Sequence, residues 1–313
     1  MNKVYVSLTG GLGNQLFQLS AAMSLIEDNE EIFLLDIFGK PRSTNGLPDI
    51  CGFKLGDNVK YWKGTSAPFF LRKAVGFFLR MGINPRGWEN ITFLKFLYKW
   101  ILSLLVSLFF RERIEVINGR DVGYSDLGKS KKKILLVGYF QSYRYAKSLK
   151  FKSEYLQIRQ SEGERNSDSI SLHDISNRLI IHLRLTDYLI EEDFGIPNQN
   201  YYKMGLKQIC SLREFKDIWI FSDDIEMAKN LLEIPEKFTI SWMKCEKLES
   251  YEILNLMRYG SGYIIANSTF SWWAAYMSRC VDPIVVAPIP WFRGMASPSH
   301  LIPDNWTTVE AWR

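Results

Sequence analysis

The side chains best suited to hold a nucleotide gather in three short polar clusters in the second half of the chain. These clusters are residues 182–187, 222–224 and 267–271. Arg184 in the first cluster can make a charge-assisted, bidentate contact to a phosphate, although pairing with the nearby carboxylate of Asp187 would use the same group. The chemistry indicated is the binding of an anionic group by fixed hydrogen-bond donors.

The other two clusters offer a choice between ligand binding and helix capping. Asp223 or Asp224 could accept a hydrogen bond from a ribose hydroxyl or a base edge, but Ser-Asp-Asp after a strand is also a common helix start. Ser268 and Thr269 follow Asn267, and hydroxyl and N–H groups at a helix start suit a phosphate. Helix capping is again the alternative.

A glycine-rich loop at residues 9–18 is a further candidate for ligand contact. The candidate contacts in it are Gly11, Gly13, Asn14 and Gln15. Leu16 stands where a dinucleotide fingerprint requires its third glycine, and no G-x-x-x-x-G-K-[ST] sequence occurs. A tight turn that binds nothing is the alternative, because a lone glycine cluster is a weak signal.

Alternating strands and helices must position the three polar clusters. The patterns predict strands over 178–185, 217–221, 238–242, 263–266 and 283–287, helices over 201–210 and 250–259, and helices that end at 232 and 278. Such alternation indicates a parallel, doubly wound sheet, whose ligands bind beyond the carboxyl ends of the strands. All three clusters fall at such ends, so we expect this half to carry the binding site.

The first half opens with the same order of elements. Residues 3–8 alternate as a strand, and helical spacing begins at Leu16. A length of 313 residues with 47% hydrophobic content suggests two domains, which we place at 1–160 and 161–313. The predicted fold class is α/β.

Residues 60–113 differ from the rest of the chain in charge. They contain ten basic and two acidic residues, a net charge of +8, whereas the whole chain carries +5. The segment is rich in aromatic residues, and its longest apolar run, 100–110, is about half of the ~20 residues needed to cross a bilayer. An amphipathic helix on an anionic membrane and a helical hairpin that fills the first domain's core both explain this pattern. No nucleic-acid-binding motif accompanies it.

Cysteine and histidine usage predicts neither a metal site nor disulfides. The four cysteines lack C-x-x-C spacing, the three histidines lack metal-ligand spacing, and no Asp-x-Asp occurs. Because no N-terminal signal peptide precedes them, the cysteines are expected to be reduced thiols of a cytoplasmic protein. Segment 60–113 adds a peripheral contact with the inner face of the membrane to this expectation.

Five motifs together resemble glycosyltransferase family 11, the α-1,2-fucosyltransferases, whose bacterial members act in surface-polysaccharide and O-antigen synthesis. The motifs lie at 10–18, 138–143, 182–188, 221–224 and 267–273. They keep the family's order, whereas residues 39–133 carry no match. The resemblance implies a GT-B-like architecture, in which two Rossmann-like, doubly wound domains face a cleft.

The resemblance also implies a reaction. Residues 161–313 would hold the donor GDP-β-L-fucose, and residues 1–160 would present the acceptor, an oligosaccharide or a lipid-linked glycan. Transfer would be inverting and metal-independent, without a cofactor, and would give an α-1,2 linkage to a galactose O2. The residues implied to contact the donor are Arg184 at the diphosphate, Ser268 and Thr269 at the phosphates, and Asp223 or Asp224 at the guanosine. Asn14 would contact either the donor or the cleft wall.

The first polar cluster departs from the family pattern His-x-Arg-Arg-Gly-Asp-Tyr. Leu185 replaces the second arginine, and Thr186 replaces the glycine. Since side chains alternate along a strand, residue 185 should face away from Arg184 and leave donor binding intact. Asp187 is either the general base or a partner that orients Arg184, and His182 is either catalytic or a buried, hydrogen-bonded histidine.

Two other classes of protein stay open on the sequence alone. A Rossmann oxidoreductase would use Asp36 at the end of the second strand, but the third glycine is absent and the other motifs go unexplained. A non-catalytic nucleotide-sugar or glycan-binding protein would keep the fold, and the altered His-x-Arg motif is its only support.

Overall fold

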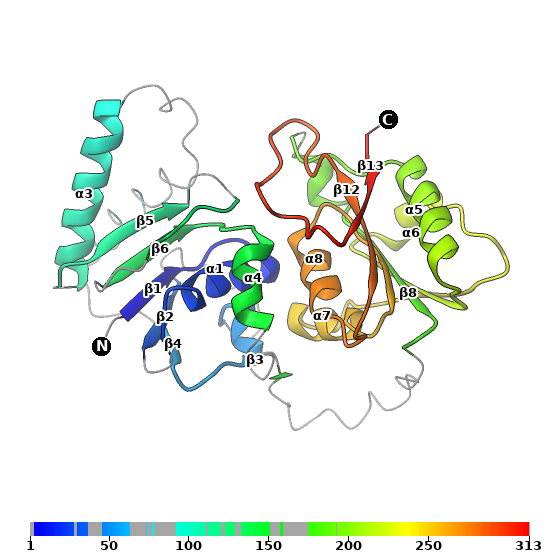
Figure 1. Cartoon of the computed structure of the whole chain (residues 1–313), viewed down its shortest axis with the longest axis horizontal. Helices are drawn as coiled ribbons and strands as arrows, with labels where there is room; N and C mark the ends of the chain where they lie inside the picture. The colour runs from blue at the N-terminus through cyan, green and yellow to red at the C-terminus, as the bar shows by residue number, and fades with distance from the viewer. Residues whose placement is uncertain are drawn as a thin grey trace. The chain divides into compact units, whose positions relative to one another are not determined.

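A computed structural model of the chain describes residues 3–27, 30–36, 46–62, 73, 77, 92–110, 112–119, 123–128, 133–150, 157–158, 175–191 and 193–312. The chain divides into two compact units, residues 1–157 with 298–301 and residues 158–297 with 302–313. We call them unit 1 and unit 2. Each is built on a parallel β-sheet with helices on both faces, which confirms the α/β fold class (Figure 1).

Unit 1 contains a five-stranded parallel sheet in the order β4-β2-β1-β6-β5. Its strands are β1 (Lys3–Ser7), β2 (Glu31–Leu35), β4 (Val59–Trp62), β5 (Glu115–Gly119) and β6 (Ile134–Gly138). The central strands β1 and β6 are almost wholly buried, because helices cover both faces of the parallel sheet. The 3₁₀-helix η1 (Asp49–Gly52) precedes β3 (Phe53–Lys54), which pairs with β7 (Gln157–Ile158) in a small separate sheet.

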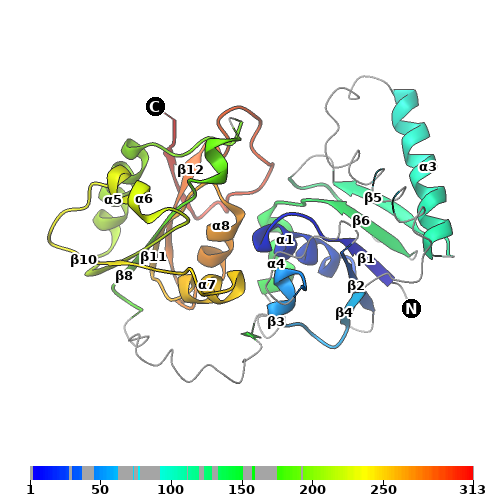
Figure 2. The same ribbon diagram turned by 180° about the vertical axis from the view of Figure 1, so that it is seen from behind.

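Helices cover both faces of the unit 1 sheet. Helices α1 (Leu12–Met23) and α4 (Tyr143–Lys150) pack against each other on one face. On the other face α3 (Thr92–Phe110) lies along β5, and its Leu102 and Val106 are buried in a cluster with Tyr5 of β1 (Figures 1 and 2). This face of α3 therefore does what the core-filling alternative requires, whereas most of 63–91 lies outside the described residues. Within the described part of the chain, no helix combines the length and the apolarity needed to cross a bilayer.

The turn between β1 and α1 is tighter than the sequence predicted. Helix α1 begins at Leu12 instead of Leu16, because the N–H groups of Asn14 and Gln15 already bond to the carbonyl of Gly11, at 3.0 and 3.1 Å. Gly10 has φ +74°, a backbone conformation that residues other than glycine rarely adopt, and this residue allows the chain to turn. The glycine-rich loop is therefore mostly the first turn of a helix.

Unit 2 contains a six-stranded parallel sheet in the order β10-β9-β8-β11-β12-β13. Its strands are β8 (Arg178–Leu183), β9 (Asp217–Ser222), β10 (Thr239–Trp242), β11 (Gly262–Ile264), β12 (Ile284–Ile289) and β13 (Thr307–Glu310). Numbered along the chain, this is the order 3-2-1-4-5-6 of a doubly wound Rossmann sheet, so that part of the prediction is confirmed. The order reverses between β8 and β11.

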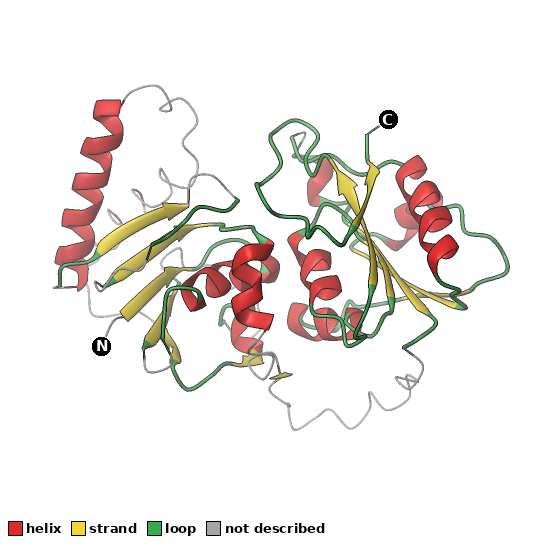
Figure 3. Cartoon of the chain, in the orientation of Figure 1, coloured by secondary structure: helices red, strands yellow, loops and turns green. Residues whose placement is uncertain are grey.

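Four helices cover the unit 2 sheet. Helices α5 (Gln199–Leu212) and α6 (Ile225–Leu231) lie on one face, and α7 (Ser250–Met257) and α8 (Thr269–Tyr276) lie on the other (Figures 2 and 3). Trp272 and Trp273 of α8 are fully buried. The strand predicted over 178–185 ends at Leu183, so Arg184 stands just beyond it at the edge of the sheet.

A short segment late in the chain belongs to unit 1 although unit 2 surrounds it in the sequence. This segment is residues 298–301. The carbonyl of His300 accepts hydrogen bonds from the N–H of Tyr143, at 2.8 Å, and from the hydroxyl of Ser142, at 2.9 Å. The carbonyl of Ser299 accepts from the N–H of Tyr124 at 3.2 Å. The segment therefore completes the start of α4 and the stretch that precedes β6.

Candidate functional site

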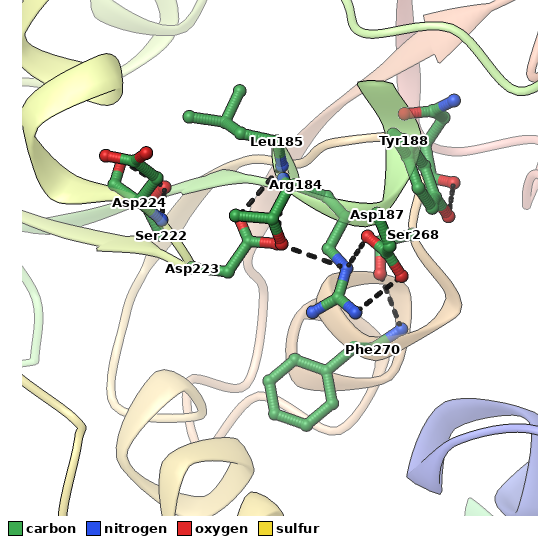
Figure 4. A network of polar contacts seen from close by, with 11 residues as sticks. Arg184, Leu185, Asp187, Tyr188, Ser222, Asp223, Asp224, Ser268 and Phe270 are labelled. Atoms are coloured by element: carbon green, nitrogen blue, oxygen red, sulfur yellow. Dashed lines mark hydrogen bonds and ion pairs between the residues drawn. The ribbon is translucent and has the colours of Figure 1, made fainter. Parts of the chain in front are cut away.

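The polar clusters of unit 2 meet at the point where its strand order reverses. Residues 184–188 follow β8, Asp223 follows β9, and residues 267–269 follow β11, which pairs with β8. In doubly wound sheets this reversal opens a crevice at the carboxyl ends of the strands, where ligands bind. Figure 4 shows the labelled side chains of these three turns in one group. The predicted convergence of the clusters is therefore present.

Arg184 is the cation at the centre of this group. Its Nε and Nη2 donate to the two carboxylate oxygens of Asp187, at 2.8 and 2.7 Å, in a bidentate ion pair (Figure 4). Asp223 adds a second carboxylate, 3.5 Å from Nε. The Arg184 side chain keeps 34% of its surface exposed, and the third nitrogen, Nη1, donates to no residue that the structure describes. The guanidinium is thus oriented by protein carboxylates while one donor group stays available.

Asp223 holds the turn after β8 in place. Its carboxylate accepts from the N–H of Leu185 at 2.8 Å, and from both the N–H and the hydroxyl of Thr186, at 3.2 and 2.6 Å. Burial works to raise the pKa of Asp223, but these hydrogen bonds and the charge of Arg184 outweigh it and lower the pKa. Asp223 is therefore an ionised carboxylate that accepts hydrogen bonds from Leu185 and Thr186. Its contact with guanosine stays a prediction.

Leu185 does face away from Arg184. It is fully buried and belongs to the unit 2 core, packed with residues of α5 and the neighbouring strands. Its N–H, not its side chain, takes part in the polar group, through Asp223. The leucine that replaces the family arginine therefore reinforces the core at this turn.

His182 is buried beneath the charged group. Its side chain lies 6.1 Å from the ring of Phe270, measured between ring centroids. Burial, with the nearby charge of Arg184, lowers the pKa of His182 to about 3, against an opposing effect of Asp223. Nδ1 of His182 is buried and has no hydrogen-bond partner in the described part of the chain. The imidazole is therefore neutral at physiological pH, and both its catalytic role and its alternative as a buried, hydrogen-bonded histidine stay predictions.

The start of α8 is tied to the charged turn by Tyr188. The Tyr188 hydroxyl donates to the carbonyl of Asn267 at 3.1 Å, and burial raises the pKa of Tyr188. The Asn267 amide donates to the carbonyls of Phe194 and Gly195, at 2.9 and 3.1 Å. The Tyr188 side chain had no assigned role in the sequence, and no local pattern pairs residues 79 positions apart.

Ser268 and Asp224 both serve as helix caps. The hydroxyl of Ser268 accepts from the N–H of Phe270 at 3.3 Å, and the carboxylate of Asp224 accepts from the N–H of Met227 at 2.9 Å. Thr269 is the first residue of α8. Capping therefore occurs at both positions, and the predicted contacts of these residues with a donor stay predictions.

The glycine-rich turn of unit 1 is closed by its own amides. Gln15 donates to the carbonyl of Gly10 at 3.1 Å and accepts from the N–H of Ile50 at 3.0 Å. Gln141, after β6, donates to Asn14 at 2.9 Å. Gly11 is the N-cap of α1, and Gly13 is buried within that helix. The four candidate contacts thus have structural tasks, and their contact with a ligand stays a prediction.

Gln18 bridges two strands of unit 1 and was not singled out in the sequence. It is fully buried. Its side chain accepts from the N–H of Thr9 at 3.1 Å and donates to the carbonyls of Thr9 and Gly138, at 3.3 and 2.8 Å. The sequence signal that could have identified Gln18 is a glutamine on the apolar side of a helix, because a buried amide side chain needs hydrogen-bond partners.

Within the part of the chain that the structure describes, no group of three or more His, Cys, Asp or Glu side chains is arranged to hold a metal ion. Metal independence of the predicted reaction is a separate matter and stays a prediction.

Comparison with known proteins relates most of the chain to one family. The sequence profile of the family described as Glycosyl transferase family 11 matches residues 97–307. The chain is similar to an alpha-1,2-colitosyltransferase of Escherichia coli, at 26% identity over 99% of this chain and 100% of that protein. It is also similar to the O-antigen biosynthesis glycosyltransferase WbnK of Escherichia coli, at 32% identity over 43% of this chain and 45% of that protein.

The solved structures that resemble the chain are remote in sequence. The fucosyltransferase NodZ from Bradyrhizobium matches with a TM-score of 0.46 and 12% identity, over 89% of this chain and 94% of that one. The ADP-heptose lipopolysaccharide heptosyltransferase II of E. coli matches with a TM-score of 0.47 and 10% identity, over 99% of this chain and 90% of that one.

Proposed function

Because the chain belongs to glycosyl transferase family 11, we propose that it transfers an L-fucose-type deoxyhexose from its GDP-activated form to the O2 of a galactoside, in O-antigen synthesis. Transfer gives an α-1,2 linkage with inversion and needs neither a metal nor a cofactor. Unit 2 binds the nucleotide sugar, and unit 1 binds the acceptor glycan. Because the chain belongs to this glycosyltransferase family, the alternative of a Rossmann oxidoreductase is set aside.

The observation that carries this proposal is Arg184 at the strand-order reversal of unit 2. Its guanidinium is oriented by Asp187 and supported by Asp223, and Nη1 stays available for a ligand oxygen. A hydrogen bond from Tyr188 to Asn267 links the start of α8 to the same turn. The N–H groups at this helix start favour an anion. A diphosphate is the group that such a site suits.

The proposed chemistry is a single displacement. The acceptor O2 attacks C1 of the sugar, the bond between C1 and the β-phosphate oxygen breaks, GDP leaves with that electron pair, and the acceptor proton passes to a base. Charge develops on the β-phosphate as the bond breaks, so preorganised donors aimed at it lower the barrier. Arg184 fills that role, with Ser268 and Thr269 at the start of α8. Asp223 or Asp224 contacts the guanosine.

Asp187 has two candidate roles in this mechanism, general base or partner of Arg184. Both of its oxygens are engaged by the guanidinium, and half of its side chain is exposed. We assign it the role of partner, because a base must offer a free oxygen to the acceptor hydroxyl.

Fucose and colitose are the two donor sugars to compare. The similarity to a colitosyltransferase spans nearly the entire chain, whereas the family pattern around Arg184 is altered at Leu185 and Thr186. Colitose is fucose without its 3-hydroxyl. A site that hydrogen-bonds this hydroxyl would reject colitose by about 10⁴-fold, whereas an apolar site would discriminate far less.

The test is incubation of the purified protein, with EDTA, with GDP-fucose or GDP-colitose and a panel of galactosides. Released GDP and the mass and linkage of the product are measured. We expect an α-1,2-linked product with one of the two donors and no effect of EDTA. Activity that requires an added divalent cation would contradict the metal-independent mechanism. Calorimetric binding of the GDP-sugar without product on any acceptor would support the non-catalytic alternative, and absence of binding would refute the donor assignment.

A further inference from the structure

Helix α3 carries an apolar ridge that its own unit does not bury. Trp100, Leu104 and Leu108 are spaced by four residues, so they lie on one side of the helix. Their exposed fractions are 59%, 48% and 58%. Three large apolar side chains in line, each about half exposed, form a continuous patch and are not scattered surface residues.

The opposite side of α3 shows that the ridge is not simply a loosely packed core face. Leu102 is 1% exposed and Val106 is fully buried, both in the cluster that joins α3 to the sheet. Figure 1 shows β5 beside this helix. The helix is thus apolar on two sides, one of which is already used by the fold. The other needs a different occupant.

Charge decides among the occupants. Segment 60–113 carries +8, and α3 itself contains two lysines and no acidic residue. Glu112, just beyond α3, is already paired with Lys133. A second copy of this chain would bring the same positive charge to the ridge and be repelled, whereas an anionic surface would be attracted.

We propose that the ridge of α3 docks on the surface of an anionic lipid bilayer, with the helix in the plane of the interface. A helix of 19 residues is about 28 Å long and can lie along the headgroup region without crossing the membrane. Tryptophan is favoured at this depth because its ring is amphipathic. The net positive charge of segment 60–113 attracts the anionic headgroups. The inference stands independently of the donor sugar and of the transfer reaction.

The test is flotation of the full chain with vesicles of phosphatidylcholine, with and without phosphatidylglycerol. We expect binding to the anionic vesicles, little binding to the neutral ones, and release as salt shortens the range of the charges. A triple variant, Trp100→Ser, Leu104→Ser and Leu108→Ser, should bind the anionic vesicles roughly tenfold more weakly or worse, because the apolar contact is lost.

A matched triple variant controls for the general loss of surface hydrophobicity. Met204→Ser, Leu212→Ser and Leu248→Ser replace exposed apolar residues of unit 2, with 45%, 59% and 37% exposure, and should leave vesicle binding unchanged. Circular dichroism and thermal unfolding establish that both variants fold. Wild-type protein that ignores anionic vesicles, or a ridge variant that binds as well as wild type, overturns the proposal. So does self-association of the wild type that the ridge variant abolishes, since that assigns the ridge to a second copy.

Discussion

In each sheet the strand order reverses at one point, between β1 and β6 in unit 1 and between β8 and β11 in unit 2. The turns to compare are those that follow β1 and β8. The turn of unit 1 is filled by neutral amides. Gln15, Gln18 and Gln141 bond to backbone groups and to Asn14, and Gln18 reaches across to the end of β6. Every one of these contacts joins the chain to itself, although Oε1 of Gln141 is buried without a hydrogen-bond partner in the described part of the chain.

The turn of unit 2 is filled by charges that do not balance. Arg184 faces Asp187 and Asp223, keeps a third of its side chain exposed, and leaves a donor without a protein partner among the described residues. Nδ1 of His182, buried beneath it, has no hydrogen-bond partner among the residues that the structure describes. We therefore expect the same position of the fold to serve stability in unit 1 and reactivity in unit 2. Substitutions in the turn of unit 1 should therefore lower the free energy of unfolding, and substitutions in the turn of unit 2 should lower activity.

The largest effect is expected for Arg184→Ala. Loss of the guanidinium removes a preorganised donor from the leaving diphosphate, which should lower kcat/KM about 10²–10³-fold, or about 3–4 kcal/mol of transition-state stabilisation. The free energy of unfolding should change little, because the ion pair is half exposed. Lys203→Ala, which removes an exposed cation of the same unit, is the control for net charge. Equal loss of activity in both variants would contradict the assignment.

Next in size is Gln18→Leu in unit 1. The apolar side chain fits the buried site but leaves the backbone groups of Thr9 and Gly138 unpaired, which should lower the free energy of unfolding by about 2–3 kcal/mol. Urea titration measures this loss. The exposed glutamine Gln208, changed in the same way, should cost less than about 0.5 kcal/mol. A stable Gln18→Leu variant with abolished activity would break the comparison, because unit 1's turn would then act in chemistry.

His182 should make stability depend on pH. Its pKa is about 3 in the folded chain and 6.5 as the ordinary value, so below pH 6.5 the unfolded chain takes up a proton that the folded chain does not. The stability contribution is complete above about pH 6.5 and is lost as the pH falls toward 3. Between pH 7.5 and pH 5 the loss is about 2 kcal/mol. In His182→Gln the free energy of unfolding should fall by that much less over the same interval, and an unchanged pH dependence would refute the burial argument.

Asp187→Asn should change donor binding more than chemistry. The amide keeps the shape of the side chain and removes a negative charge beside the diphosphate site, so KM for the donor should shift by up to about tenfold. We expect kcat to change less than KM. A fall in kcat of about 10²-fold or more with KM unchanged would instead identify Asp187 as the general base.

The smallest effect is expected for Thr186→Val. The substitution removes one hydrogen bond to Asp223 and leaves two backbone bonds in place, which should cost about 1 kcal/mol or less. The pKa of the Asp223 carboxyl should rise, since the Thr186 hydroxyl helps to lower it. Carboxyl titration by NMR and steady-state kinetics measure both effects. A loss as large as that of Arg184→Ala would show that Thr186 itself contacts substrate.

The sequence could predict the alternation of unit 2 because strand and helix periodicity are local properties. It missed β13, whose Thr-Thr-Val-Glu residues are only alternately half-buried and form no apolar run. It also started α1 four residues late, because Gly13 and Asn14 are poor signals of a helix interior and the buried surroundings override them.

The convergence of the polar clusters was predictable for a similar reason, since carboxyl ends of parallel strands share one edge of a sheet. The bonds inside the group were not. Asp223 reaches the backbone of residues 185 and 186, and Tyr188 reaches Asn267, in both cases through contacts distant in sequence. Such pairings depend on the register of β8 with β9 and β11, which only the folded sheet fixes.

Residues 298–301 have a consequence for how this protein exchanges parts with its relatives. They lie within the second half of the gene, yet their partners Tyr124, Ser142 and Tyr143 are encoded in the first. A chimera joined near residue 160 would therefore pair a unit 1 from one parent with a 298–301 segment from the other. Recombination that preserves folding should transfer residues 298–301 together with the N-terminal half. Exchange of unit 1 therefore needs two breakpoints more than a single crossover near residue 160, one on each side of this segment.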